Sequence, residues 1–320
     1  MRLSGRSRRA VFGFVTPVVA IVGAVSLGAG IMAASCGPPP TTTTTSTTTT
    51  TFPVVRDDTN TGPSGPLTPT PCVDHDITVA FTVVQDVELG SPSAPCSIRV
   101  LADNVTFTNF RIFGRIVVGE DDSTALIAPA GVRIDTGDFV GAGYDNAISV
   151  VADADGAWTA NNFHGYENCV TEWTGTRDEI DSNYCHAEAS QSSAPHYDGF
   201  EVYGTSGGIT ITGNNVQMSV ADGATAPVNV TPSPLDSGTV YVVGNVLRSA
   251  NCSYVVLGDD RAANAQPYQI NLVNNRLGLA PGSECGYWVL HAAKSGTFCT
   301  VEQNRDLDTL ALLPSANCTP

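Results

Sequence analysis

The stretch "ITITGNNV", residues 209–216, is followed by three similar runs: "VYVVGNV" at residues 240–246, "INLVNNR" at residues 270–276 and "CTVEQNR" at residues 299–305. Each run joins β-branched and aliphatic residues to an asparagine, and β-branched residues favour strands. We call these asparagines anchors, and they follow one another at intervals of 30, 30 and 29 residues: Asn215, Asn245, Asn275 and Asn304. The regular interval predicts an all-β structure built from repeated coils.

Similar runs lie upstream and add four anchors: Asn109, Asp138, Asn162 and Asn183. A second β-rich run follows the anchors, as in "NCVTEW" at residues 168–173 and "DGFEVY" at residues 198–203. Short coils made only of strands favour a parallel β-helix, here of roughly eight coils, in which each strand stacks on the equivalent strands of its neighbours. Asparagine at a fixed turn position can bind the next coil's backbone. A β-propeller has longer blades, and a β-sandwich does not need this fixed asparagine.

The segment "HYDGFEVYGTSGGITITGNNV", residues 196–216, resembles a coil of the right-handed parallel β-helix proteins of the pectate-lyase-like superfamily. The resemblance covers roughly residues 95–310 and implies a right-handed helix. Members of the superfamily act mostly on polysaccharides, as lyases, hydrolases or C5-epimerases, and others are not catalytic. "PHYD" is also similar to the Asp-Pro-His-Asp motif of alginate C5-epimerases, except that Ala194 replaces the first Asp and Tyr197 is inserted before Asp198.

The chain divides into three parts. Residues 1–36 carry four arginines and then an apolar run, which predicts a signal segment for export. "MAASC" resembles a bacterial lipoprotein signal that would leave a lipid on Cys36; the alternative is that the apolar run stays in the membrane as an anchor. Residues 37–71 are rich in Thr and Pro and predict a disordered linker. Residues 72–320 would form the β-helix, so we expect an exported protein at the cell surface, lipid-anchored or secreted.

Nine cysteines support export, because lipidation of Cys36 would leave eight to form disulfides. If "NCSYVV" and "ECGYWV" are equivalent strands, Cys252 and Cys285 stand within disulfide reach. Proximity in the sequence predicts three further pairs: Cys72–Cys96, Cys169–Cys185 and Cys299–Cys318. None of the cysteines has the Cys-x-x-Cys spacing of a zinc site.

The charge excludes several partners. The whole chain has a net charge of −16, and beyond Cys36 it has 11 basic against 31 acidic residues, a net charge of −20. Such a surface repels nucleic acid and anionic membranes, so we expect membrane contact only through the lipid or the anchor. It also disfavours a polyanionic substrate unless Ca²⁺ or a local Arg cluster screens the charge. Ca²⁺ is the one cofactor left open, and we expect a monomer that binds an extracellular glycan.

Aligning the second runs of successive coils predicts which side chains stand side by side. The alignment places Glu201 next to Glu172 on the outer face, with Val255 and Trp288 farther along the same column. Two carboxylates about 5 Å apart suit a retaining glycosidase, in which one acts as acid and the other as nucleophile. Crowding of like charges also raises the pKa of one of them. The alternatives are two solvated charges or a cation site.

Three of the five histidines fall on three successive coils: His164, His186 and His196. A histidine can act as general base with a carboxyl partner. We therefore predict a site that spans these coils, with four catalytic residues: Glu172, His196, Asp198 and Glu201. The predicted substrate-binding residues are His164, Trp173, His186, Tyr197 and Tyr203. Three histidines with a carboxylate could also hold a transition metal, but no two of them have ligand spacing on one strand, so we predict no metal site.

These observations favour a surface-tethered protein that binds and cleaves an extracellular polysaccharide. Arg177 is the only basic residue other than histidine between Gly165 and Asn245, which favours hydrolysis of a neutral glycan over elimination. One alternative is a non-catalytic adhesin or cell-wall structural protein. A second is a Ca²⁺-dependent polyuronate lyase or C5-epimerase.

Overall fold

The computed structural model describes residues 54–72, 75–122, 125–141, 144–152, 155–189, 195–204, 207–219, 224–232, 238–250, 254–280 and 286–318. The predicted signal segment, with Cys36, lies outside these residues, as do most of the predicted linker and both cysteines of the predicted pair Cys252–Cys285. The described residues form strands, turns and loops. Among them, no helix is long and apolar enough to cross a membrane.

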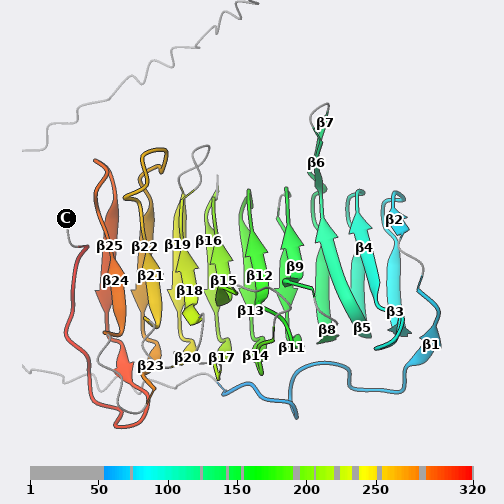
Figure 1. The fold of residues 1–320 in the computed structure, drawn as a ribbon, viewed down its shortest axis with the longest axis horizontal. Helices are drawn as coiled ribbons and strands as arrows, with labels where there is room; N and C mark the ends of the chain where they lie inside the picture. Colours follow the sequence, from blue (N-terminus) through cyan, green and yellow to red (C-terminus); the bar gives the residue numbers. More distant parts are fainter. Residues whose placement is uncertain are drawn as a thin grey trace, which may run out of the picture. The chain divides into compact units, whose positions relative to one another are not determined.

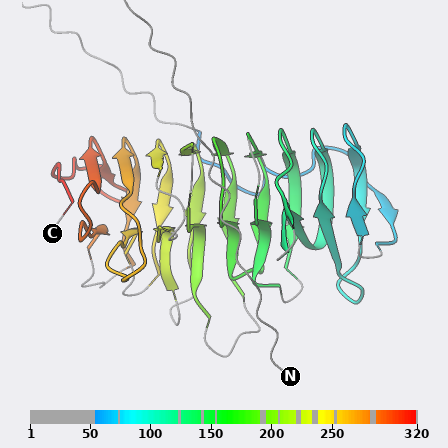
Figure 2. The same cartoon turned by 90° about the horizontal axis from the view of Figure 1, so that it is seen from above.

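The strands form three stacks, and each full coil of the chain contributes one strand to each stack. Within a stack, neighbouring strands pair in parallel, and 24 strands join into one continuous sheet. Figure 1 shows the coils following one another along the long axis, from β1–β3 at one end to β25 at the other, and Figure 2 shows the same succession from above. The predicted all-β parallel β-helix is therefore confirmed.

The first stack holds the first residues of β3 (Val83–Leu89), β5 (Thr106–Val118) and β8 (Arg133–Val140), then β10 (Ala157–Thr159), β13 (Asp178–Asp181), β16 (Ile209–Thr212), β19 (Thr239–Val243), β22 (Gln269–Val273) and β25 (Phe298–Glu302). The second holds β1 (Thr68–Thr70), the following residues of β3, β5 and β8, then β11 (Asn162–His164), β14 (Tyr184–His186), β17 (Asn215–Gln217), β20 (Val246–Arg248), β23 (Arg276–Gly278) and β26 (Arg305–Asp306). The third holds β2 (His75–Ile77), β4 (Cys96–Val100), the end of β5, then β9 (Asn146–Val150), β12 (Asn168–Glu172), β15 (Tyr197–Val202), β18 (Ala224–Val230), β21 (Val256–Gly258) and β24 (Trp288–Leu290). Only β6 (Glu120–Asp122) and β7 (Ala125–Ile127) form a separate antiparallel pair among the described strands.

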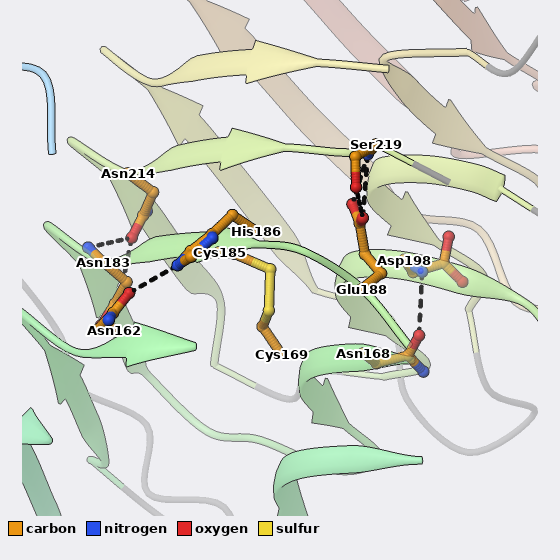
Figure 3. Close-up of a disulfide and its surroundings, with 10 residues drawn as sticks. All are labelled: Asn162, Asn168, Cys169, Asn183, Cys185, His186, Glu188, Asp198, Asn214 and Ser219. Atoms are coloured by element: carbon orange, nitrogen blue, oxygen red, sulfur yellow. Dashed lines mark hydrogen bonds between the residues drawn. A yellow bond between two sulfur atoms is a disulfide. The ribbon is translucent and has the colours of Figure 1, made fainter. Parts of the chain in front are cut away.

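Buried asparagines form a ladder at the turn between the first and second stacks. The Oδ1 atom of each asparagine accepts hydrogen bonds from the backbone N and the Nδ2 of the asparagine one coil earlier, as Asn214 does from Asn183 at 2.9 Å (Figure 3). Each Nδ2 also donates to a backbone carbonyl of the preceding coil, as from Asn214 to Ile180 at 2.8 Å. The ladder therefore satisfies buried polar groups that the turns would otherwise leave without partners. Its members are Asn161, Asn183, Asn214, Asn245, Asn275 and Asn304.

The ladder corrects half of the predicted anchors. Asn162 and Asn215 are each one residue beyond the true ladder member, and Asn109 and Asp138 do not belong to it. On the coil before Asn161, the ladder position is Gly137, whose backbone N donates to Asn161 Oδ1 at 2.8 Å. A Cβ at Gly137 would lie 2.4 Å from Phe110 Cζ, so the aromatic core excludes an asparagine there.

Inward-facing side chains form continuous columns along the axis. One column of the third stack holds Ile98, Ile116, Ile148, Val170, Phe200, Val228 and Val256, all almost fully buried. In the first coils a row of phenylalanines fills the space between the stacks, with ring centroids 4.8–5.6 Å apart: Phe107, Phe110, Phe139 and Phe163. Burial of these apolar columns is the main term that stabilises the fold.

Three predicted disulfides are confirmed. Cys72–Cys96 joins the first coils. Cys169–Cys185 links β12 to β14 through the interior, with both side chains buried (Figure 3). Cys299–Cys318 ties the C-terminal tail to β25, and Ala316 also pairs with Val301 of that strand. The tail therefore covers part of the edge of the last coil, as expected for the terminal unit of a repeat protein.

Residues 54–71, predicted as the end of the disordered linker, are ordered against the β-helix. Arg56 donates to Ser182 Oγ at 2.9 Å, and its carbonyl accepts from Asn215 Nδ2 at 2.6 Å. Farther along, Gly62 N donates to the carbonyl of Ala160. The segment therefore runs along successive coils back towards β1 at the N-terminal end (Figure 1). Composition predicted disorder because these residues have few apolar side chains to bury. The segment is instead held to the β-helix mostly by polar contacts.

Candidate functional site

The pairing of β12 with β15 corrects the predicted carboxylate pair. Thr171 lies opposite Glu201, and Glu172 lies opposite Val202. The sequence alignment was therefore shifted by one residue between these two coils. Because side chains alternate along a strand, a shift of one residue moves a side chain to the other face of the sheet. Glu201 faces outward, and Glu172 faces the core.

The outer column that contains Glu201 runs through nine strands of the third stack. Its members are Asp76, Arg99, Val117, Ser149, Thr171, Glu201, Asn229, Leu257 and Val289. The predicted neighbours Val255 and Trp288 are not in this column. Leu257 and Val289 occupy these positions instead, so the predicted register is wrong by two residues on β21 and by one residue on β24. The coil of β18, which the prediction omitted, supplies Asn229 between Glu201 and Leu257.

Glu172 occupies an inward column that is otherwise mostly valine, between Val150 and Val202. It is fully buried, and its Oε1 accepts a hydrogen bond from Trp158 Nε1 at 2.7 Å. Its Oε2 has no hydrogen-bond partner among the described residues. Burial raises the pKa of Glu172 well above its ordinary value, and the nearby charge of Asp178 raises it further. The predicted catalytic role of Glu172 on the outer face therefore does not fit its position.

We expect Glu172→Gln to stabilise the protein at neutral pH. The folded state retains a proton on Glu172 that the unfolded chain releases above about pH 4.5, the ordinary value, so this group lowers stability as pH rises. Glutamine keeps the acceptor for Trp158 and does not titrate. The melting temperature at pH 7.5 should rise by about 2 °C or more, which is the shift that a stabilisation of roughly 1 kcal/mol produces in a chain of this size. At pH 4 the variant and the wild type should melt together; a gap that does not change with pH would contradict this account.

Around Glu201 the structure assembles a polar cluster from three coils. Asn168 Nδ2 donates to Glu201 Oε2 at 3.0 Å. Asn168 Oδ1 accepts from the backbone N of Asp198, as Figure 3 shows. Asp198 in turn accepts from Ala226 N at 3.0 Å. Asn168 and Asp198 therefore hold neighbouring coils together while lying beside the Glu201 carboxyl. Asp198 is 1% exposed and Glu201 is 9% exposed, so Glu201 is the carboxyl that a ligand on this face can reach.

Both carboxyls of the cluster are protonated more readily than in water. Burial raises the pKa of Asp198 well above its ordinary value, and the charge of Glu201 adds to this effect. Burial also raises the pKa of Glu201, against the lowering effects of a hydrogen bond from Tyr203 and the charge of His196. His196 is exposed, and its backbone N donates to Glu167 Oε1 at 2.6 Å. A proton donor with a raised pKa beside an exposed imidazole is an arrangement suited to acid–base chemistry.

Two aromatic rings stand at the edge of this cluster. Trp173 and Tyr203 follow β12 and β15, and their rings stack with centroids 4.3 Å apart and planes 8° from parallel. Trp173 is 43% exposed, so one ring face is open to a ligand. The third predicted aromatic residue, Tyr197, is instead 6% exposed and packs in the core. Its position before the "DG" turn suggested a surface residue, but β15 already begins at Tyr197.

The structure places His164 and His186 in a separate group. Both lie on the second stack in one outer column, and Tyr184, His186 and His164 form a row of stacked rings. His164 Nε2 lies 3.2 Å from Asp138 Oδ1, and His186 Nε2 lies 3.2 Å from Asp58 Oδ1 in the N-terminal segment. The turn into the third stack separates this row from Glu201. Among the described residues, no group of three or more His, Cys, Asp or Glu side chains could hold a metal ion.

Two pockets flank the Glu201 cluster on the same face. One, of about 490 Å³, lies towards the N-terminal end, and its lining includes Arg99, Arg115 and Tyr144. The other, of about 500 Å³, lies towards the C-terminal end, and its lining includes Leu257 and Val289. Sequence reasoning missed both pockets, together with Asn168, Thr171 and Asn229. The period-two alternation along each strand would have identified Thr171 and Asn229 as neighbours of Glu201 once the register was correct.

Comparisons with known proteins found no relative of this chain. No family model matches the chain, and neither curated proteins nor solved structures yield a match. The fold and the site geometry thus identify the protein as a parallel β-helix with a polar, partly aromatic outer face on its third stack.

Proposed function

We propose that this protein binds an extended extracellular polysaccharide along the outer face of its third stack and hydrolyses it at Glu201. The observation that carries the proposal is the outer column: one continuous row brings a carboxyl with a raised pKa between two pockets and beside the stacked rings of Trp173 and Tyr203. A shallow face of this length suits a chain ligand better than a small molecule. Its resemblance in sequence supports membership of the pectate-lyase-like superfamily.

In the proposed reaction Glu201 donates its proton to the glycosidic oxygen, and His196 removes a proton from the attacking water. The raised pKa of Glu201 keeps a fraction of it protonated where an ordinary glutamate would be ionised. Asp198 acts as a positioning residue, since it is buried and holds the backbone of β18. Trp173 and Tyr203 offer a flat apolar surface for the C–H face of a sugar ring.

The three disulfides support an exported protein, because such bonds persist in oxidising compartments. The predicted signal segment and the predicted lipid on Cys36 would place it at the cell surface. We propose that it acts there as a monomer.

Incubation of the full chain with a panel of polysaccharides tests the reaction. Release of new reducing ends without absorbance from unsaturated sugars is the expected result. Unsaturated products would indicate elimination, whereas binding without any product, with or without Ca²⁺, would indicate an adhesin.

We expect Trp173→Ala to weaken glycan binding about tenfold, which corresponds to about 1.4 kcal/mol. The variant removes the stacking surface without touching the core, since Trp173 is exposed. Tyr241→Ala is the matched control, because Tyr241 is 44% exposed but lies on β19 in the first stack. Isothermal titration with a bound polysaccharide measures both. Equal losses in the two variants would show that the third stack is not the binding face.

The N-terminal pocket favours a second candidate, a lyase or epimerase acting on an acidic glycan. Arg115 lies over the Tyr144 ring at 5.0 Å and donates to Ser97 Oγ at 3.1 Å. Its positive charge could bind a sugar carboxylate, although the neighbouring Arg99 is already paired with Asp76 and Glu120. Ca²⁺-dependent release of unsaturated sugars from polyuronates would favour this candidate over hydrolysis.

A further inference from the structure

The outer column of the third stack changes character just beyond Glu201. On the central coils its members are polar, namely Ser149, Thr171, Glu201 and Asn229. On the next two coils the same column presents Leu257 and then Val289. Outer positions of a sheet that faces water are usually polar. Two aliphatic side chains side by side on this face therefore form a local apolar floor.

This floor belongs to the C-terminal pocket of about 500 Å³. One side of it is lined by the first residues of β18, Ala224 and Thr225, and by Tyr254, which precedes β21. The other side is lined by residues that follow the strands, namely Asp259, Arg261 and His291. The pocket therefore combines an aliphatic floor with a rim of hydrogen-bonding groups. This combination is typical of sites that bind small ligands in a fixed orientation.

The rim is held in place before any ligand arrives. Arg261 Nε and Nη2 donate to the two oxygens of Asp259 at 2.9 and 2.7 Å. The backbone N of Asp259 donates to the carbonyl of Val230, and that of His291 donates to the carbonyl of Gly258. A preorganised rim lowers the entropic cost of binding.

We propose that this pocket is a subsite for a sugar residue that carries a small apolar substituent, such as the methyl group of a 6-deoxy sugar or of an acetyl ester. The proposal rests on the proposed function. Leu257 and Val289 have no flat face for ring stacking, unlike Trp173 and Tyr203, but they can enclose a methyl group. The Asp259–Arg261 pair, Tyr254 and His291 can bind ring hydroxyls. A pocket of this volume lies within the range of pockets that bind small ligands and fits a sugar residue.

The position of the pocket fixes its relation to the reaction. Leu257 lies two strands from Glu201, through Asn229, which corresponds to about 10 Å at the usual strand spacing. The sugar residue that carries the substituent is therefore near the cleaved bond but is not one of the two residues that this bond joins. The pocket selects which part of the polysaccharide is presented to Glu201.

Titration of the full chain with matched sugar pairs, followed by saturation-transfer NMR, tests the subsite. The probes are 6-deoxymannose against mannose and 6-deoxygalactose against galactose. We expect at least one 6-deoxy sugar to bind about tenfold more tightly than its partner, since one methyl contact is worth at least this factor. Its methyl protons should receive the strongest saturation.

The double variant Leu257→Asn, Val289→Thr should abolish the preference, and Val243→Thr, the same kind of change on the first stack, should leave it intact. Leu257→Asn places an asparagine at the same outer position that Asn229 occupies one coil earlier, so the fold should tolerate the change. Equal affinities within both pairs, no binding of any probe, or a preference that survives the double variant would each overturn the subsite. The polysaccharide panel and the Glu201 variant test the proposed function separately.

Discussion

Asn214→Ala should lower the free energy of unfolding by about 3–5 kcal/mol, the largest stability loss that we expect from one polar side chain. The change removes the acceptor of two Asn183 donors, and it leaves the buried carbonyl of Ile180 without the Asn214 donor. Each buried polar group left without a partner costs about 1–3 kcal/mol. Urea denaturation of the variant and the wild type measures the loss.

Asn271→Ala is the matched control. Asn271 lies on β22, two coils after Asn214, at a partly exposed position, and its side chain makes no hydrogen bond to another of the described residues. Its substitution should change stability by less than about 0.5 kcal/mol. If the two alanine variants unfold at the same urea concentration, the asparagine ladder does not hold the coils together as described.

Glu201→Gln should lower the rate of polysaccharide hydrolysis by about 100-fold or more, the usual contribution of a general acid. Glutamine keeps an oxygen for Asn168 Nδ2 but has no proton to transfer. Affinity for the polysaccharide should change little. The wild-type rate should fall on the alkaline side, at a pH above 4.5, because burial raises the pKa of Glu201. This alkaline fall should disappear in the residual activity of the variant. A variant that keeps the wild-type rate would remove Glu201 from the mechanism.

The fold could be predicted from the sequence because the repeat is visible as a regular pattern of residues. β-branched runs and asparagines recur at a nearly constant interval, and four of the eight predicted anchors, Asn183, Asn245, Asn275 and Asn304, are members of the ladder. The three described disulfides were predicted from the proximity of their cysteines in the sequence. Where two asparagines are adjacent, as at Asn214 and Asn215, composition alone could not tell which one points into the turn.

The site was predicted less well because its geometry depends on the register of single residues. Glu201, Asp198, His196, Trp173 and Tyr203 do lie together. Glu172 was misplaced because coil lengths vary and a shift of one residue reverses a side chain's direction. His164 and His186 were grouped with the site because their coils are adjacent to that of Glu201. They lie on the second stack, however, and the second and third stacks face different sides of the β-helix. Contacts across coils, such as Asn168 with Glu201, could not be inferred without the correct register.

The most direct test of the account compares reducing-end release by Glu201→Gln and Glu172→Gln on the same polysaccharide under the same conditions. Both variants replace a carboxyl by an amide, and the two side chains lie on neighbouring strands but on opposite faces of the sheet. The account predicts that Glu201→Gln loses at least about 100-fold in rate and that Glu172→Gln keeps the wild-type rate. Loss of activity only in Glu172→Gln, or an equal loss in both variants, would contradict the placement of the site on the outer face of the third stack.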